Sequence, residues 1–512
     1  MPTALLVVAL VAVVIAAGPA GPVRAAATPP PDTTPAPPPV NVQVGSTAVG
    51  RPIAPSFVGL SIEFPAIRTY TGLNPDAINP VFVQLIRNLA PGEAPVVRIG
   101  GNSTDATWLP ARGVHPTPGI HSTITSRFLA LVRNLATETR ARLILGLNLK
   151  LNSATEVAAE AHAFLTGIGA QHIDALEIGN EPELYTIAPW YTTPSGKSVY
   201  SRRRGFNFGV YAKEITEYAR ELKGNPLAGP ATGNQVWLNK LPKLFGVEPG
   251  LKVITYHRYP LIRCFTSPGD PNYPTIPNLL ALRSSRGLVD GVTNQISYAH
   301  NRGATFRLDE LNSVACKGQP GVSDTFASAL WVLDTLFSLA RSGVDGVNIH
   351  TLPEAAYRLF TFTDTNGHWQ AAVKPEYYGL LMFGAAAPPG SRLLPVSPSA
   401  TPDLRAWATR LSDGEVHVLV INDSPTTDHI IRLDPPSGAQ SNAVVQRLTA
   451  PSAAATTGVT LAGQSFGAET ATGSLTGPFQ EDHLQPVNGQ YLIDVPASSA
   501  ALVGFVPAHS AG

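Results

Sequence analysis

The sequence has little cysteine, little charge and no excess of either sign. Two of the 512 residues are cysteine, 14% are charged, and 36 basic residues match 36 acidic ones, so the formal net charge is zero. A nucleic-acid-binding protein shows a basic excess, and we therefore expect no nucleic-acid partner. The hydrophobic share of 44% is large enough to bury a sizeable core and argues against global disorder.

Long apolar runs are also missing. No run of about 18 or more apolar residues follows the N-terminal region, so we expect no membrane span. The first apolar stretch, Ala4 to Ala17, is too short to cross a bilayer, and Ala25 to Ala27 fit a signal-peptide cleavage site. We expect residues 1–27 to be a signal peptide and the protein to be secreted or located in the cell envelope. The Pro/Thr/Ala-rich residues 28–40 favour an extended linker.

From residue 55 onward, short apolar runs alternate with segments of helical spacing. Repeated strand–helix units over roughly 300 residues are typical of an α/β fold, the (β/α)₈ or TIM barrel, which we place at 55–375. One long helix, within 322–342, is predicted to begin at an N-cap Ser323 and to end before Gly343. The eight predicted strands lie at 55–64, 95–100, 141–149, 173–179, 230–233, 251–256, 305–311 and 344–350.

The pattern changes after about residue 376. Several short strands follow one another, separated by turn residues such as Ser412, Asp413 and Gly414. Strands of this kind predict a C-terminal antiparallel β-sandwich over residues 376–512. A further strand, within residues 41–54, precedes the barrel and is expected to join that sandwich.

Polar side chains gather just after the predicted barrel strands, where TIM-barrel enzymes place their active sites. A barrel without a site has no need for so many polar groups at one end. The residues are Glu63, Arg98, Asn102, Ser103, Asp105, Asn180, Glu181, Glu183, His257, Tyr259, Asp309, Glu310, Asn312 and His350.

Two of these glutamates have the positions needed for glycoside hydrolysis. Glu181 follows strand four in an Asn-Glu-Pro sequence, and Glu310 ends strand seven, across the barrel. A retaining glycosidase needs two carboxyl groups about 5–5.5 Å apart, one protonated and one ionised. Adjacent strand residues point to opposite faces, so only one of Asp309 and Glu310 is expected to face the site.

Three stretches carry a resemblance to a known family. Gly179 to Pro182, Val97 to Asp105, and Gly321 to Trp331 after Glu310 resemble glycoside hydrolase family 79, the heparanase and exo-β-glucuronidase family of clan A. The likeness extends from about Val40 to the C-terminus and weakens over the last hundred or so residues. It implies a retaining mechanism, a barrel with an appended β-sandwich, and no metal or other cofactor.

The resemblance also assigns roles to individual residues. It implies that Glu181 is the general acid/base and Glu310 the nucleophile. The residues implied to bind or orient the substrate are Asn180 at the sugar 2-hydroxyl, Asp105 and Glu63 at ring hydroxyls, Asn102 beside them, His257 or Tyr259 at the nucleophile, and Tyr357 at a uronate carboxylate.

The stretch after the nucleophile departs from the family pattern. Characterised exo-glucuronidases of this family have a carboxylate-binding tyrosine there, whereas this chain has Val314 to Gly318, with Lys317 as a point charge instead. The leading hypothesis is a secreted β-glucuronidase acting as a monomer on a carbohydrate substrate. A β-glycosidase for a neutral sugar and an endo-acting, heparanase-like hydrolase remain alternatives. A non-catalytic carbohydrate-binding protein of the envelope is disfavoured because both glutamates are present.

The two cysteines follow neighbouring strands. Cys264 comes after strand six and Cys316 after strand seven, so their loops should lie side by side at the catalytic face. An even number of cysteines in an exported protein permits a disulfide. We expect Cys264 and Cys316 to form a disulfide that braces the site.

Overall fold

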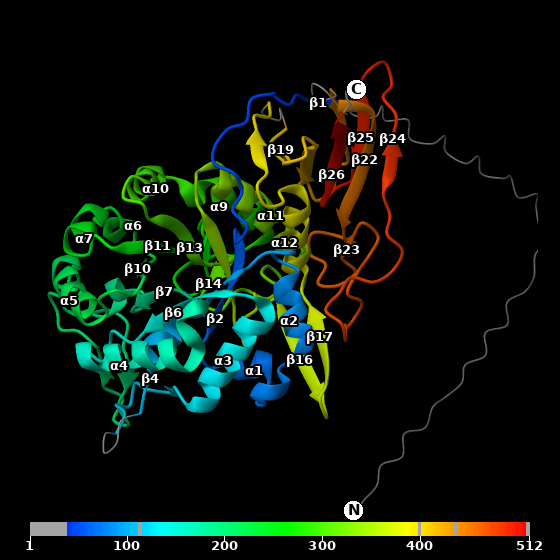
Figure 1. Ribbon diagram of the computed structural model, residues 1–512. Helices are drawn as coiled ribbons and strands as arrows, with labels where there is room; N and C mark the ends of the chain where they lie inside the picture. The colour runs from blue at the N-terminus through cyan, green and yellow to red at the C-terminus, as the bar shows by residue number, and fades with distance from the viewer. Residues whose placement is uncertain (1–37, 111–114, 398–400, 435–438, 508–512) are drawn as a thin grey trace, which may run out of the picture. The chain divides into compact units, whose positions relative to one another are not determined.

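A closed barrel of eight strands forms the centre of the computed structural model (Figure 1), which describes residues 38–110, 115–397, 401–434 and 439–507. Neighbouring strands pair in parallel, in the order β10-β11-β13-β15-β2-β3-β6-β7. The predicted TIM barrel is therefore confirmed. The expected signal peptide at 1–27 and most of the linker at 28–40 lie outside the described residues.

The barrel alternates strands with helices along the chain. Its strands are β2 (Val58–Glu63), β3 (Val96–Gly100), β6 (Arg142–Leu147), β7 (Ile173–Ile178), β10 (Leu227–Thr232), β11 (Leu251–Arg258), β13 (Thr305–Leu311) and β15 (Gly346–Thr351). The α-helices are α1 (Ala66–Thr71), α2 (Pro80–Arg87), α3 (Ser126–Thr139), α4 (Ala154–Phe164), α5 (Phe208–Glu221), α6 (Gln235–Leu238), α7 (Leu241–Val247), α8 (Ile276–Leu280), α9 (Leu282–Ser285), α10 (Thr293–His300), α11 (Phe326–Arg341) and α12 (Pro375–Ala386).

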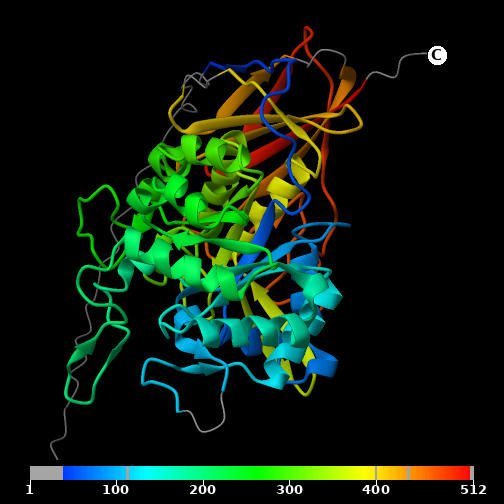
Figure 2. The ribbon, with the colours of Figure 1, turned by 60° about the vertical axis from the view of Figure 1, so that its left-hand side comes forward.

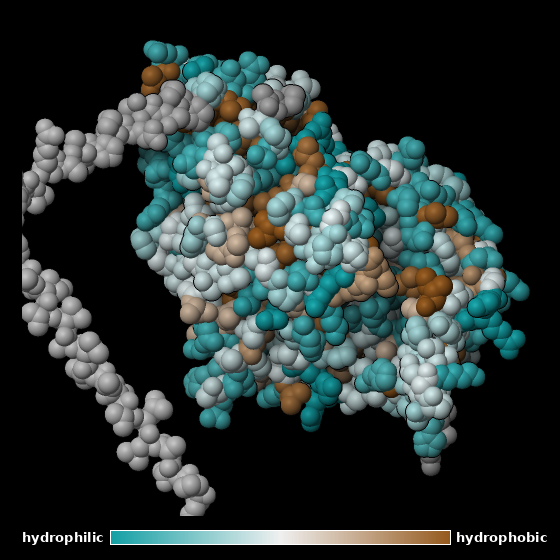
Figure 3. Space-filling model, turned by 180° about the vertical axis from the view of Figure 1, so that it is seen from behind, coloured by the Kyte–Doolittle hydropathy of each residue, from teal (hydrophilic) through white to brown (hydrophobic). Residues whose placement is uncertain are grey.

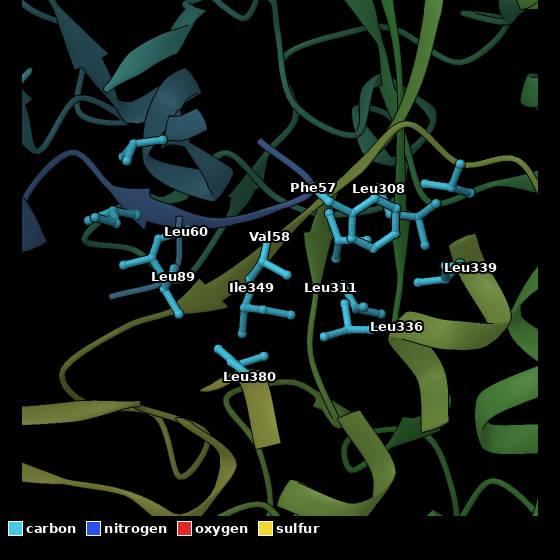
Figure 4. Close-up of a cluster of buried hydrophobic side chains, with 14 of the residues drawn as sticks. Phe57, Val58, Leu60, Leu89, Leu308, Leu311, Leu336, Leu339, Ile349 and Leu380 are labelled. Carbon is cyan, nitrogen blue, oxygen red and sulfur yellow. The ribbon is translucent and has the colours of Figure 1, made fainter. Parts of the chain in front are cut away.

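The strands form because short apolar runs are buried on both faces, as in any parallel sheet covered by helices. Figure 4 shows part of this core, where Leu308 and Leu311 of β13 lie among side chains from β2, β15, α11 and α12. These two leucines flank Asp309 and Glu310 in sequence. Burial of the leucines therefore fixes the segment that carries the predicted nucleophile.

The long helix α11 begins later than the sequence predicts. Its N-cap is Thr325, and its first residue is Phe326. The predicted N-cap, Ser323, instead accepts from the backbone N–H of Gln319, and Asp324 accepts from that of Gly321. These side chains stabilise the turn before the helix, which explains why the cap prediction was two residues early.

Two sheets form the β domain, which contains one strand from before the barrel and the strands that follow it. β1 (Val40–Val42), β21 (His429–Leu433) and β25 (Tyr491–Val495) make one sheet, in which β1 pairs parallel to β21. Buried side chains of both sheets share one core, as in a sandwich. The other sheet contains β18 (Arg392–Leu394), β19 (Leu404–Arg410), β20 (Val416–Asn422), β26 (Ser499–Pro507), β22 (Ala439–Thr449), β23 (Thr460–Leu461) and β24 (Asp482–Leu484).

The β domain contacts α11 and α12 of the barrel (Figure 1). Trp407 of β19 stacks on Phe337 of α11 with ring centroids 5.4 Å apart, and its Nε1–H donates to Asp334 Oδ1 at 2.8 Å. Arg405, also on β19, lies 3.9 Å from Asp334 Oδ2 of α11 and donates to Leu280 O of α8 at 3.2 Å. Apolar and polar contacts together therefore join the two parts.

Several short strands lie in the loops that follow the barrel strands. The loop after β7 carries the hairpin β8 (Tyr191–Thr192) and β9 (Ser198–Val199), which projects from the barrel in Figure 2. The loops after β11 and β13 pair through β12 (Leu261–Ile262) and β14 (Val314–Ala315). The other short strands are β4 (Thr107–Trp108), β5 (Ser122–Thr123), β16 (Phe360–Thr365) and β17 (His368–Val373).

Hydrophobic residues on the face shown in Figure 3 occur in small groups among hydrophilic ones. Within the described part of the chain, no helix has both the length and the apolar character needed to cross a bilayer. The apolar side chains of the barrel form one large core and a second, small cluster of Val96, Ile144, Ala175, Ala228 and Val253.

A disulfide between Cys264 and Cys316 joins the loops after β11 and β13, with Cα atoms 6.0 Å apart. Both residues lie next to the paired strands β12 and β14, and the backbone N–H of Arg263 donates to Ala315. The bridge therefore fastens two loops that flank the end of β13.

Removing this disulfide should destabilise the protein. A bridge that spans 52 residues stabilises by about 4 kcal/mol if it acts through the entropy of the unfolded chain. We expect Cys264→Ser/Cys316→Ser to lower the free energy of unfolding by up to that amount, measured by urea denaturation. Wild type in reducing buffer should match the variant. Two thiols that react in the native wild type, or an unchanged stability, would contradict the expectation.

Candidate active site

Six barrel strands bring polar side chains to one end of the barrel. These side chains lie at, or directly after, the carboxyl ends of β2, β3, β7, β11, β13 and β15. Carboxyl ends of parallel barrel strands meet on one face, which brings groups far apart in sequence together. Seven of the nine residues predicted to act on the substrate belong to one network of contacts: Glu63, Asn102, Asn180, Glu181, His257, Tyr259 and Glu310.

A sharp turn after β7 presents Glu181. Gly179 has φ 81° and Glu181 has φ 45°, both in the left-handed region. Gly179 suits this backbone because it has no Cβ, whereas the glutamate is strained there. The N–H of Glu181 donates to Ala231 O at 2.8 Å, which ties the turn to β10. The fold therefore maintains an unfavourable backbone conformation at one predicted catalytic residue.

Gly233 leaves room for the Glu181 carboxyl group. A Cβ at Gly233 would lie 3.2 Å from Glu181 Oε1 and 3.7 Å from Glu183 Oε1. The N–H of Gly233 donates to Glu183 Oε1 at 2.8 Å. Burial and then the nearby Glu181 raise the pKa of Glu183 to about 7. The carboxyl group of Glu183 therefore lies beside that of Glu181. The sequence interpretation gave Glu183 no role.

An irregularity in β13 turns Asp309 and Glu310 toward the same neighbour. From Arg307 to Glu310 the strand advances three residues while β11 advances two, and β13 gains the same extra residue against β15. This is a β-bulge, which interrupts the alternation of side chains. Both carboxylates contact Arg98, at 3.0 Å from Asp309 and 2.8 Å from Glu310. Both side chains point into the barrel because regular alternation does not continue through the bulge, and the expectation that only one of them faces the substrate remains a prediction.

The two predicted catalytic glutamates lie close together. One oxygen of Glu181, one oxygen of Glu310 and one ring nitrogen of His257 all lie within 4.8 Å of one another. The carboxyl groups of retaining glycosidases are about 5–5.5 Å apart, whereas inverting enzymes leave room for a water molecule between theirs. The observed geometry favours direct attack on a sugar by one of the two carboxylates.

Glu310 is held as a carboxylate. Tyr259 Oη donates to Oε1 at 2.9 Å, and Arg98 Nη1 donates to Oε2 at 2.8 Å. Burial alone would raise the pKa of Glu310, but His350, His257 and Arg98 hold it well below the ordinary value. An ionised, oriented carboxylate is what a nucleophile at a sugar carbon requires.

His257 bridges the two glutamates. Its Nδ1 lies 3.2 Å from Glu181 Oε1 and 3.9 Å from Glu310 Oε2. Burial lowers the pKa of His257, but Glu310 and the hydrogen bond to Glu181 outweigh this and raise it to about 9. The ring is therefore protonated at neutral pH, and its Nδ1–H donates to Glu181.

Asn180 and Glu63 border the same pair of carboxyl groups. Asn180 Oδ1 accepts from Arg98 Nη2 at 2.9 Å, and its Nδ2 donates to Asn102 Oδ1 at 3.4 Å. Glu63 accepts from the backbone N–H groups of Asn102 and Ser103, at 3.0 and 2.7 Å. Burial raises the pKa of Glu63. These contacts fix the positions of the side chains, and their predicted contacts with sugar hydroxyls remain predictions.

Asp105 is buried and fully engaged by the chain itself. Its Oδ1 accepts from the N–H groups of Leu149 and Lys150 at 3.0 and 3.2 Å, and its Oδ2 accepts from Tyr185 Oη at 2.7 Å. The structure therefore places Asp105 as a link between the segment after β3 and the loop after β6. Its predicted contact with ring hydroxyls remains a prediction.

Tyr357 lies one ring away from the predicted nucleophile. Its ring centroid is 6.2 Å from that of Tyr259, which in turn donates to Glu310. Burial and the nearby Glu310 raise the pKa of Tyr357. The backbone N–H of Ala356 donates to Lys317 O at 2.8 Å, which brings the disulfide-bearing loop alongside Tyr357.

Sequence reasoning gave no role to several residues beneath this site. Arg98 and Glu177 are buried in the middle of apolar strands, and Asp309 was treated as an alternative to its neighbour. A charged residue inside an otherwise apolar strand is rarely buried without a partner. The position of Arg98 and Glu177 inside apolar strands could therefore have indicated ion pairs inside the barrel.

The same constellation could in principle coordinate a metal ion, since Glu181, His257 and Glu310 each offer a ligand atom. Two positive charges oppose this. Arg98 already binds Glu310, and the raised pKa of His257 keeps a proton on the ring nitrogen. The expected absence of a metal or other cofactor remains a prediction.

Comparison with known families agrees with the fold. Residues 406–502 match the glycosyl hydrolase family 79 C-terminal beta domain. Among solved structures, a 4-O-α-L-rhamnosyl-β-D-glucuronidase from Fusarium oxysporum 12S superposes with a TM-score of 0.69 at 18% identity, over 90% of this chain and 99% of that one. A family 51 arabinofuranosidase from Xanthomonas axonopodis pv. citri gives 0.63 at 13%, over 91% and 100%.

Two curated relatives extend over most of the chain. A β-glucuronidase of Aspergillus niger is 26% identical, covering 89% of this chain and 91% of its own length. A β-glucuronidase of Neurospora crassa is 25% identical, covering 83% and 87%. With the matched C-terminal domain and the confirmed barrel, these similarities show that the chain is a glycoside hydrolase and confirm its resemblance to glycoside hydrolase family 79.

Proposed function

We propose that this protein is a retaining β-glucuronidase, with Glu310 as nucleophile and Glu181 as general acid/base. The observation that carries the proposal is the pair of carboxyl groups within 4.8 Å, one of which is held ionised by Arg98 and Tyr259. That separation suits a covalent intermediate on the enzyme.

In the first step, Glu310 Oε attacks the anomeric carbon of the glucuronide while the C–O bond to the leaving group breaks. Protonated Glu181 gives its proton to the departing oxygen, which leaves as an alcohol. The product of this step is a glucuronyl ester of Glu310. Tyr259 donates to Oε1 and Arg98 to Oε2, and both bonds orient the carboxylate for attack.

In the second step, ionised Glu181 removes a proton from water, and the oxygen of that water attacks the anomeric carbon. The ester bond to Glu310 breaks, and both carboxyl groups return to their starting states. Because the sugar is attacked twice from opposite faces, the product retains the β configuration. His257, which lies between the two glutamates, would steady Glu181 in both protonation states.

Lys317 supports a substrate that carries a carboxylate. It is exposed and lies on the loop beside Tyr357, where the backbone N–H of Ala356 donates to Lys317 O. An ammonium group at this point can bind a uronate carboxylate as a point charge. The two curated relatives are named β-glucuronidases, which favours the same substrate class. We further propose that the protein is exported.

Aryl β-glycosides test the proposed reaction. Wild type should release p-nitrophenol from the β-glucuronide, and Glu310→Ala should lose on the order of 10⁴-fold or more in kcat. Glu181→Ala should lose about 10²- to 10⁴-fold on substrates that need protonation. Azide should then restore turnover, giving the α-glucuronyl azide with Glu310→Ala and the β-glucuronyl azide with Glu181→Ala.

Glu354→Ala is the matched control, because Glu354 is an exposed glutamate in the loop after β15. It should keep wild-type activity. Cleavage of only a neutral glycoside would support the retaining mechanism and contradict a glucuronide as the substrate. Failure on every aryl glycoside, together with digestion of a uronate polysaccharide, would favour an endo-acting enzyme. An azide product of the opposite configuration would reverse the roles of the two glutamates.

Lys317→Met tests recognition of the carboxylate. Loss of a hydrogen bond to a charged group costs about 1.5–3 kcal/mol, so kcat/KM for the glucuronide should fall about 10- to 100-fold. The corresponding glucoside should be unaffected. Lys252→Met serves as the control, because Lys252 is exposed near the start of β11, at the end of the barrel away from the site. Equal losses on both substrates, or no loss on either, would remove Lys317 from the proposed carboxylate site.

The depressed pKa of Glu310 predicts that the acid side, or acid limb, of the pH–activity profile lies at unusually low pH. At pH values just below 4.5, the ordinary value, Glu310 remains ionised, so kcat/KM should stay near its maximum. Tyr259→Phe removes one donor to the carboxylate, and the acid limb should move up by about one pH unit. Initial rates across pH, with intrinsic fluorescence to monitor folding, check this. A wild-type limb at about 4.5, or one that Tyr259→Phe leaves in place, would show that these donors do not set the ionisation.

A further inference from the structure

Arg98 meets two more carboxylates beneath the nucleophile. Its Nε lies 2.7 Å from Glu177 Oε2 and 3.0 Å from Asp309 Oδ2. The side chains of all three residues are 0% exposed. Because Glu177 comes from β7 and Asp309 from the bulge of β13, the contact crosses the interior of the barrel.

One N–H group serves this pair of acids. The Nη1 of Arg98 donates to Ser61 and Glu310, and its Nη2 donates to Asn180, so its Nε–H is the group directed at Glu177 and Asp309. The hydrogen bond of this N–H goes to Glu177 Oε2, and the nearest nitrogens to Asp309 are Arg98 Nε at 3.0 Å and His257 Nε2 at 3.6 Å. Among the described residues, Glu177 Oε1 and both oxygens of Asp309 therefore accept no hydrogen bond. Two buried carboxylates with so few donors are too costly to be ionised together.

A proton held between the two acids removes this cost. Burial and the charge of Glu177 raise the pKa of Asp309 well above its ordinary value. Burial also raises the pKa of Glu177, but Arg98 outweighs it and leaves that pKa lowered. These directions favour a proton on Asp309, beside Glu177. The titratable and charged groups that face the pair are Arg98 on β3, Tyr211 on α5, His257 on β11, and Arg307 and Glu310 on β13.

We propose that Asp309 and Glu177 share one proton and act together as a single anion that holds Arg98 in place under the nucleophile. They are positioning residues, because they touch Arg98 rather than the sugar. The inference rests on the proposed role of Glu310 as nucleophile.

This anion matters most in the covalent intermediate. When Glu310 becomes an ester, it loses the negative charge that pairs with Arg98 Nη1. The shared anion then remains as the counter-ion of the buried guanidinium and keeps it from shifting. Arg98 is consequently in place to receive Glu310 again as a carboxylate when the ester is hydrolysed.

Amide substitutions test the shared charge. In Asp309→Asn, the new amide would accept from Arg98 through its carbonyl and donate to Glu177 through its NH₂, which reproduces the protonated acid. This variant should therefore keep kcat/KM on an aryl β-glucuronide within about 3-fold. Glu177→Gln should lose more, because Asp309 must then give up its proton and carry the charge alone.

The double variant removes the anion altogether. Its kcat/KM should be about 10-fold or more lower than the value expected if the effects of the two single substitutions simply multiplied. Asp423→Asn is the matched control, a buried acid paired with Arg405 in the β domain, and it should leave kcat/KM unchanged. Thermal unfolding of each variant separates loss of catalysis from loss of folding.

Difference infrared spectra of the free enzyme provide a readout that needs no substrate. Wild type minus Asp309→Asn, recorded at neutral pH in H₂O and D₂O, should contain the carbonyl band of a protonated carboxylic acid. Its presence supports the shared proton even if the enzyme prefers another glycoside. Absence of that band, a collapse of activity in Asp309→Asn alone, or additive effects in folded variants would overturn the proposal.

Discussion

The buried guanidinium of Arg98 is the interaction on which the geometry of this active site depends. An unpaired charge inside a protein is costly, and this one is stabilised because an oxygen atom accepts from each of its three nitrogen atoms. Removing a partner would leave an uncompensated charge in the core, which usually costs more than the lost contact. The hydrogen-bond and ion-pair partners come from β2, β7, β13 and the turn after β7: Ser61, Glu177, Asn180, Asp309 and Glu310.

Two local irregularities of the backbone orient the carboxyl groups of the site around Arg98. The bulge in β13 directs Asp309 and Glu310 toward Arg98 together. The left-handed turn after β7 presents Glu181 across the barrel, where His257 connects it to Glu310. Strain and bulges are common at functional sites, because the surrounding fold over-determines them. Here the buried leucines on either side of the bulge provide that support.

Much of the fold could be predicted from the sequence, because each barrel strand is a short apolar run and each helix has regular spacing. The approach of Glu181 to Glu310 followed from their positions at the ends of opposite strands. The orientation of Asp309 could not be predicted, since a bulge depends on the register of both neighbouring strands. The start of α11 was also missed, because Ser323 and Asp324 resemble a cap but stabilise a turn before the helix. The engagement of Asp105 by Tyr185 depended on loop packing, which leaves no periodic signal.

The central claim is that Glu310 forms a covalent bond to the sugar. The most direct measurement is trapping with a 2-deoxy-2-fluoro-β-glucuronyl fluoride, which slows the second step more than the first. Intact mass spectrometry should show one added fluoroglucuronyl group, and fragmentation of the digested protein should place it on Glu310. A label on any other residue, or turnover that inverts the anomeric configuration without a trapped species, would contradict the account.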